Sequence, residues 1–346
     1  MSLNLSNIKI EGYKSIKSLD LTMKPINVLI GANGSGKTNF ITVFQFLNII
    51  YQRKLQNYVA KNGGAERFLH FGSKTTEKIF LKLSFHQDET RANYYEIELT
   101  KNSEDDVLLI ELEQFFNKLA SMNAIESNLR NHKSKVGNHV KDYLSNCKVY
   151  HFHDTSETAK FKSTQDIYDN DFLHSDAANL ASFLYRLKKE FNPEYQQIIM
   201  AVQAVASFFH DFKFKVFNDN ILLRWLHTND LEGGGFSANS LSDGTARFIC
   251  MATLLLQPKQ LRPKTIVLDE PEIGLHPAAL ELLSEIIKSI ADESQIIIST
   301  QSVTLANYFD KNDFIVVDQI DGVSKFSRLG DGDELETWLT KIESLN

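Results

Sequence analysis

"GANGSGKTNF", residues 31–40, is the stretch of sequence that decides the fold. It follows the apolar run "INVLI" at residues 26–30 and precedes a segment in which apolar residues recur with helical spacing, from Phe40 to Ile50. Gly31, Gly36, Lys37 and Thr38 satisfy the pattern G-x-x-x-x-G-K-[ST], which requires a strand before it and a helix after it. The sequence therefore predicts a strand, a glycine loop that binds phosphate, and a helix.

The chemistry of this loop follows from its backbone. Glycines let successive N–H groups curl around a β-phosphate, while the Lys37 ammonium sits between β- and γ-phosphates and the Thr38 hydroxyl ligates magnesium. We expect Mg-ATP as the ligand. The residues expected to bind it are Gly31, Asn33, Gly34, Ser35, Gly36, Lys37, Thr38 and Asn39.

A second motif, "TIVLDEPE" at residues 265–272, places two adjacent carboxylates at the end of an apolar strand. Asp269 is suited to hold magnesium together with Thr38, and Glu270 to polarise an attacking water. The alternative is a solvated acidic turn before Pro271. A phosphate-binding loop in the same chain favours the catalytic interpretation.

The polar step "LSDGT", residues 241–245, begins an apolar run with helical spacing. A helix start exposes unpaired N–H groups and a positive dipole end, so it can hold an anion. The alternative is an ordinary N-cap in which Ser242 or Asp243 satisfies the first turn. The pentapeptide alone does not decide between the two.

Composition limits the class of protein. The 346 residues are 42% hydrophobic and 23% charged, which is ordinary for a globular chain, and the net charge of −7 argues against broad wrapping on nucleic acid. Two cysteines, Cys147 and Cys250, form neither a disulfide framework nor a four-thiolate zinc site, so a reducing cytoplasm is expected. The most apolar run, residues 249–256, is too short to span a bilayer, and no membrane contact is expected.

We expect three segments: residues 1–112 with the phosphate loop and a β lobe, a mainly helical insertion at 113–235, and residues 236–346. "IFLKLSF", "YYEIELT" and "VLLIEL" alternate as strands of an antiparallel sheet, the pattern from Glu113 to Phe209 is mainly helical, and "ILLRWLH" alternates as a strand. The tail after Asp313 predicts a strand, an Asp321-Gly322 turn, a strand and a terminal helix.

"GANGSGKTNF", "LSDGTARF", "VLDEPEIGLHP" and "IIISTQS" occur in this order. They resemble the phosphate loop, signature, magnesium strand with D-loop, and switch segment of ABC-type ATPase heads. The resemblance is greatest to the RecF/SMC-like ATPases among bacterial AAA-type ATP-binding proteins and continues through "VYHFHDTSE" and "ANLASFLYRL". It implies an α/β P-loop NTPase, an ABC-type head with an antiparallel β lobe and a helical insertion. It also implies ATP and Mg²⁺ as cofactors, and a homodimer that sandwiches ATP.

The resemblance assigns further residues. Ser242 and Gly244 would contact the γ-phosphate bound by the neighbouring subunit, with Asp243, a departure from the family pattern, turned away from it. Gln301 stands where many such heads have the switch histidine; it can orient water but cannot carry a proton, so slow hydrolysis is expected. Lys14 of "GYKS" corresponds to a turn near adenine and the α-phosphate, with a plain surface turn as the alternative. The glutamine expected between the lobes has no counterpart in "FLHFGSKTTEK", which offers His70.

Two polar clusters have alternative interpretations. A nuclease-like metal cluster could form from a set of histidines and aspartates, although loop and capping roles explain them better because the spacing matches no metal motif. The set is His151, His153, Asp154, Asp166, Asp169, Asp171, His174 and Asp176. The basic run from Arg130 to Lys141 could meet phosphates but is more typical of a solvated helix face or loop.

The functional hypothesis is an ATPase that dimerises on Mg-ATP as a switch. It would act in DNA repair or in anti-phage defence against foreign DNA, with a partner effector that holds the chemistry. One alternative is an ATP-dependent regulatory or scaffold protein without nucleic-acid contact. A free-standing nuclease using Asp154 and Asp171 is a further class.

Overall fold

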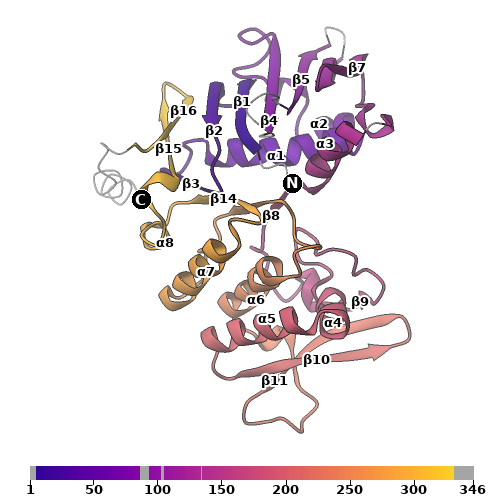
Figure 1. Ribbon diagram of the computed structural model, residues 1–346, viewed down its shortest axis with the longest axis vertical. Coiled ribbons are helices and arrows are strands. Elements are labelled where there is room, and N and C mark those ends of the chain that lie inside the picture. Colours follow the sequence, from indigo (N-terminus) through magenta and orange to yellow (C-terminus); the bar gives the residue numbers. More distant parts are fainter. Residues whose placement is uncertain (1–4, 86–92, 103–104, 134, 331–346) are drawn as a thin grey trace.

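The computed structural model describes residues 5–85, 93–102, 105–133 and 135–330. Within these residues the chain forms three β-sheets with helices packed between and beside them (Figure 1). The two lobes of the molecule meet at a mainly parallel core sheet. The glycine loop and the pair Asp269-Glu270 lie at one edge of this sheet, where its parallel strands end.

The core sheet has the strand order β16-β15-β3-β14-β13-β8. Its neighbours pair in parallel except for β16, which returns antiparallel beside β15. The strands are β3 (Ile26–Ile30), β8 (Lys148–Tyr150), β13 (Thr265–Asp269), β14 (Gln295–Thr300), β15 (Phe314–Ile320) and β16 (Val323–Arg328). The prediction that "INVLI" is a central, buried strand is confirmed, because every residue of β3 is buried between β14 and β15.

The two faces of this sheet supply two hydrophobic cores, since successive side chains of a strand point to opposite faces. In β3, Val28 and Ile30 belong to the core shared with the lower helices, whereas Leu29 belongs to the core shared with the β lobe. A strand buried on both faces reads as a continuous apolar run, which is why β3 shows no alternation in the sequence.

The β lobe is an antiparallel sheet in the order β2-β1-β4-β5-β6-β7, as predicted from its alternating strands. Its strands are β1 (Leu5–Tyr13), β2 (Ile16–Thr22), β4 (Lys78–Phe85), β5 (Asn93–Lys101), β6 (Leu108–Phe115) and β7 (Lys118–Ala124). The accompanying helices are α1 (Lys37–Tyr51), α2 (Leu55–Lys61) and α3 (Lys135–Asn146). Apolar residues of α1 fill the core between this lobe and the core sheet.

The lower lobe packs helices against a small sheet in which β11 pairs with β10, β12 and β9. These strands are β9 (Gln165–Asp166), β10 (Phe209–Phe217), β11 (Asn220–His227) and β12 (Phe236–Ser237). The helices of the lower half are α4 (Leu180–Glu190), α5 (Asn192–Val205), α6 (Asp243–Leu256), α7 (Pro277–Ile290) and α8 (Val303–Ala306). Residues of α4 to α7 share one hydrophobic core with the core sheet.

The prediction of a mainly helical pattern from Glu113 to Phe209 is wrong in its first part. β6 extends to Phe115, so the boundary expected after residue 112 falls inside a strand, and β7 follows it. β7, "KLASMNA", is a sheet edge whose large apolar residues, Leu119 and Met122, are exposed and do not alternate with polar ones; the strand is held by backbone pairing to β6. β8 has three residues, too few to show a period, yet it joins the core sheet.

The strand, turn and strand predicted after Asp313 are confirmed. Asp321 and Gly322 both have positive φ, of 51° and 78°, as a tight hairpin between β15 and β16 requires. The predicted terminal helix lies outside the described residues. Among the helices that are described, none combines the length and the apolar character needed to cross a membrane.

Candidate nucleotide-binding site

The glycine loop joins β3 to α1 and surrounds a cavity of about 190 Å³. The residues that line this cavity are Asn33, Gly34, Ser35, Gly36, Lys37, Thr38, Asn39 and Glu270. All the predicted loop residues except Gly31 therefore face one space, and Glu270 reaches it from the second motif.

The shape of the loop explains two of its glycines. A Cβ at Gly31 would lie 2.1 Å from the carbonyl oxygen of Val317, and a Cβ at Gly36 would lie 1.9 Å from Ser324 Oγ. Gly36 also has a φ of 110°, a backbone conformation that side chains with a Cβ rarely adopt. Both positions thus require glycine for packing inside this chain.

Lys37 is held inside the loop. Its Nζ donates to the carbonyl oxygens of Gly31, at 2.5 Å, and Ala32, at 3.0 Å. Burial lowers the pKa of the Lys37 ammonium, while the carboxylates of Glu270, Glu272 and Asp269 raise it. The Lys37 ammonium therefore lies at the centre of the loop, where a phosphate could contact it, and the carbonyl oxygens of Gly31 and Ala32 hold it there.

A serine network that the sequence interpretation missed anchors the loop to two distant segments. Ser324 Oγ, on β16, lies 2.7 Å from both Ser15 Oγ and the carbonyl oxygen of Ser35. The Asn39 amide donates to the same Ser15 Oγ at 2.6 Å. The loop is thereby braced by the β1–β2 turn and by the C-terminal hairpin.

Asp269 and Glu270 lie at the carboxyl edge of the core sheet, beside the loop, because β13, β14 and β3 run parallel. Asp269 Oδ1 is buried and has no hydrogen-bond partner among the described residues, which fits a carboxylate that holds a cation. Glu270 has a positive φ of 46°, and its N–H donates to the Ser299 carbonyl oxygen at 2.8 Å. Together with the exposed Thr38, these groups suit Mg²⁺ beside a bound phosphate.

The start of α6 carries the predicted signature. Ser242 is its N-cap and accepts from the N–H of Thr245 at 3.3 Å, so the capping interpretation is confirmed. A Cβ at Gly244 would lie 2.3 Å from the carbonyl oxygen of Gly274, so a close approach within the chain also requires this glycine. Ser242 and Asp243 are exposed. Neither Ser242 nor Gly244 lines the loop cavity, and contact with a second subunit stays a prediction.

One known protein family matches most of the chain. Residues 26–307 match the family described as "AAA domain, putative AbiEii toxin, Type IV TA system". The chain belongs to this family. The match runs from β3 to just past α8 and so contains the glycine loop, the signature, the magnesium strand and the switch segment.

Solved structures of SMC heads share the fold of this AAA-domain chain. One is an SMC head bound to the C-winged helix domain of ScpA, with a TM-score of 0.63 and 16% identity over 97% of this chain and 99% of that one. A head with an extended coiled coil, bound to the C-terminal domain of ScpA from Pyrococcus furiosus, gives 0.63 and 13% over 99% of both chains. The Thermotoga maritima SMC head gives 0.53 and 12% over 95% and 100%. A search of curated proteins finds no match. The fold is therefore that of an ABC-type ATPase head, a P-loop NTPase.

Glu272 is a further, half-buried carboxylate of this AAA domain to which the sequence interpretation gave no role. Its Oε1 accepts from Thr300 Oγ1 at 2.7 Å and from the Gln301 N–H at 3.2 Å. Burial raises the pKa of Glu272, and the Thr300 hydrogen bond lowers it. Glu272 thus ties the end of β13 to the predicted switch. The signal in the sequence was the third carboxylate of "DEPE".

Lys14 does not line the loop cavity. Its Nζ donates to Thr42 Oγ1 at 3.3 Å and lies over the rings of Tyr13 and Phe68, and burial lowers the pKa of the Lys14 ammonium. His70 Nδ1 lies 2.7 Å from the Lys14 carbonyl oxygen. The side chain that reaches the loop from this turn is Ser15, and a contact between Lys14 and nucleotide stays a prediction.

Asp154 and Asp176, at the two ends of the acidic stretch, act as loop caps. Asp154 Oδ1 accepts from the N–H and the hydroxyl of Ser156, and Asp176 Oδ1 accepts from the Ala178 N–H. Neither takes part in a metal-type cluster among the described residues. In the basic run, the Lys141 ammonium donates to the His132 carbonyl oxygen, and Lys133 and His139 are exposed, as expected for a solvated segment.

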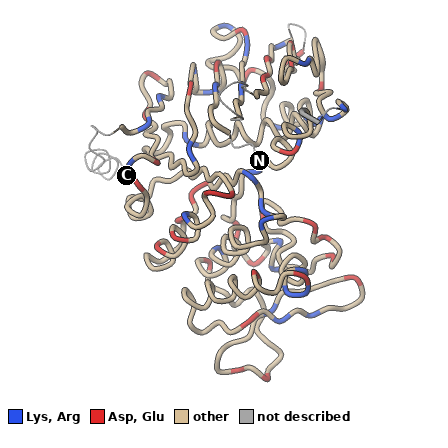
Figure 2. Tube along the Cα trace, viewed as in Figure 1, with Lys and Arg blue, Asp and Glu red and all other residues tan. Residues whose placement is uncertain are grey.

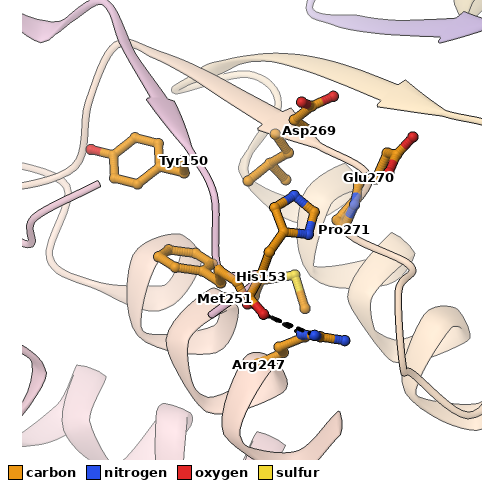
Figure 3. A pocket seen from close by; sticks show the side chains of 9 residues that line it. Tyr150, His153, Arg247, Met251, Asp269, Glu270 and Pro271 are labelled. Atoms are coloured by element: carbon orange, nitrogen blue, oxygen red, sulfur yellow. Dashed lines mark hydrogen bonds between the residues drawn. The ribbon is translucent and has the colours of Figure 1, made fainter. Parts of the chain in front are cut away.

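His151 and His153 lie beside Asp269 instead. His151 Nδ1 is 3.7 Å from Asp269 Oδ2, and Figure 3 shows the His153 ring next to Asp269 and Glu270. Burial lowers the pKa of His151, and the Asp269 carboxylate raises it. Strand order, which the sequence does not display, brings these imidazoles to the magnesium strand.

Proposed function

We propose that this AAA-domain chain binds Mg-ATP and hydrolyses it. The observation that carries the proposal is the convergence of Lys37 and Glu270 on one cavity, with Asp269 at the same sheet edge, where its Oδ1 has no hydrogen-bond partner among the described residues. A cation, a carboxylate base and a metal-type carboxylate are the parts that phosphoanhydride hydrolysis requires.

Each residue has a distinct task in this proposal. The loop N–H groups and Lys37 bind the phosphates, and Thr38 and Asp269 would hold Mg²⁺. When bound, Mg²⁺ neutralises charge on the β- and γ-phosphates. Glu270 accepts the proton of the attacking water, while the Gln301 amide orients that water by a hydrogen bond. Gln301 carries no proton, so slow turnover is expected.

Dimerisation on ATP completes the site. Ser242 and Gly244 would contact the γ-phosphate held by a second copy of the chain, because a helix N-terminus with a serine hydroxyl suits an anion. Their absence from the lining of the loop cavity and the exposure of Ser242 support a contact in trans. Hydrolysis would then open the dimer.

The test is an ATP titration and a phosphate-release assay on the full chain. We expect ATP binding in the presence of Mg²⁺ and slow phosphate release. Phosphate release should stop when the metal is chelated and should resume when Mg²⁺ is restored. Absence of ATP binding at millimolar nucleotide would contradict the proposal.

The pathway proposed is DNA repair or defence against foreign DNA, with a partner effector. The toxin–antitoxin description of the family and the ScpA-bound state of two similar heads support a partner. Figure 2 shows basic and acidic positions interspersed along both halves, so a DNA contact would be local. An ATP-dependent mobility shift of duplex DNA that weakens with salt is the expected result. No shift at micromolar protein would favour a regulatory switch without nucleic-acid contact.

A further inference from the structure

The segment His151-Phe152-His153 leaves β8 at the same sheet edge at which Asp269 ends β13. The two strands pair in parallel, with Tyr150 opposite Leu268, so the residues that follow them emerge side by side. In extended backbone, residues two apart face the same side. Both imidazoles of the segment therefore lie beside the Asp269 carboxylate.

The distances suit a shared ion. One ligand atom from each of His151, His153 and Asp269 lies within 4.8 Å of the other two, and the two imidazole centroids are 5.9 Å apart. Tetrahedral zinc with bonds of about 2.0–2.2 Å holds its ligand atoms about 3.4 Å apart, so small side-chain rotations close the cluster.

The backbone of the segment is already fixed. Arg247 on α6 donates to the carbonyl oxygens of Phe152, at 3.2 Å, and His153, at 2.9 Å. The His151 N–H donates to the Ser175 carbonyl oxygen at 3.1 Å. Ligands on a backbone held in this way lose little conformational freedom when they bind an ion.

We propose that His151, His153 and Asp269 form a binding site for a divalent transition metal of the zinc type. Two imidazoles and one carboxylate suit such ions, whereas Mg²⁺ prefers oxygen ligands. Oδ2 is the Asp269 oxygen near His151, and the buried Oδ1 is unpartnered among the described residues. The two oxygens let Asp269 serve this site and the predicted Mg²⁺ site together. Three protein ligands leave one coordination position open.

Zinc titration of the nucleotide-free full chain, freed of metal beforehand, tests the site. We expect one equivalent of Zn²⁺ per chain, with affinity lowered at least about tenfold by His151→Ala and by His153→Ala. His174→Ala is the matched control. His174, like His151, lies close to a carboxylate, with its Nε2 3.1 Å from Asp169 Oδ1, but it belongs to no three-residue cluster of this kind among the described residues. It should bind Zn²⁺ as the unaltered chain does, and millimolar Mg²⁺ should leave the zinc affinity within a few-fold.

Equal zinc affinity in the unaltered chain and in both variants, or no zinc uptake by the unaltered chain, would overturn the proposal. Circular dichroism checks that each variant folds. If His153→Ala unfolds, His151→Gln provides a second variant, because His151 is more exposed than His153. Zinc binding needs no nucleotide. Its failure would therefore leave ATP binding at Lys37 intact, and loss of ATP binding would leave the zinc result standing.

Discussion

The glycine loop and the start of α6 differ in where their polar groups point. The loop turns the Lys37 ammonium inward onto the loop's own carbonyl oxygens, and all of the predicted loop residues except Gly31 line one cavity. At the start of α6, Ser242 and Asp243 are exposed, while Gly244 packs against Gly274 of the same chain. The first region encloses a cavity within one chain. The second has the character of half a site, whose other half we propose to be a second copy.

The largest effect expected is in the loop. Lys37→Ala should abolish ATP binding without unfolding the chain, because it removes the cation aimed at the phosphates. Lys17→Ala, an exposed lysine on β2, is the control and should bind ATP normally. Isothermal titration calorimetry measures both. Undiminished ATP affinity in folded Lys37→Ala protein would contradict the assignment of the loop.

Glu270→Gln should keep ATP affinity and lower turnover on the order of 10² or more, as for loss of a positioned general base. Glu281→Gln, an exposed change on α7, should leave turnover unchanged. Phosphate release under saturating ATP gives the comparison. Equal rates in the two variants would mean that Glu270 is not the base.

Glu272→Ala should lower turnover about 10–100-fold, because it frees Thr300 and the Gln301 backbone from their shared acceptor. Glu272→Gln keeps an amide oxygen for both donors and should retain most of the rate. ATP affinity should stay within a few-fold in each. If the glutamine variant is as slow as the alanine variant, Glu272 acts by its charge and not by holding the switch.

The smallest effect concerns the cap of α6. Ser242→Ala should cost about 1 kcal/mol of unfolding free energy, because it removes the acceptor of the Thr245 N–H. Ser242→Asn preserves a capping side chain and should be closer to the unaltered chain. Urea unfolding reads both. ATP binding by the monomer should be unaffected in either variant, and a loss there would place Ser242 in the same chain's site.

Sequence reasoning identified what is contiguous. The loop from Gly31 to Thr38 and the pair Asp269-Glu270 are local motifs, each with its strand, so fold and cavity followed from them. β7 and β8 were missed because the apolar residues of the edge strand β7 do not alternate with polar ones and because β8 has only three residues.

Contacts between distant segments were beyond the sequence. Ser15 and Ser324 meet at the loop across most of the chain, and His151 meets Asp269 only because β8 lies next to β13. Strand order depends on tertiary packing, which no local pattern records. The predicted contact of Ser242 with nucleotide also depends on distant parts, because it needs the glycine loop of a second copy of the chain.

The central claim, an ATP sandwich between two copies of the chain, is tested most directly by light scattering on Glu270→Gln protein with and without ATP. We predict an ATP-dependent dimer, because this variant holds the nucleotide and does not hydrolyse it. Adding Ser242→Arg should abolish the dimer, while the ATP affinity of each monomer stays within a few-fold of that of the Glu270→Gln protein. A double variant that still dimerises with ATP would contradict the account, and Ser242 would then be only a helix cap.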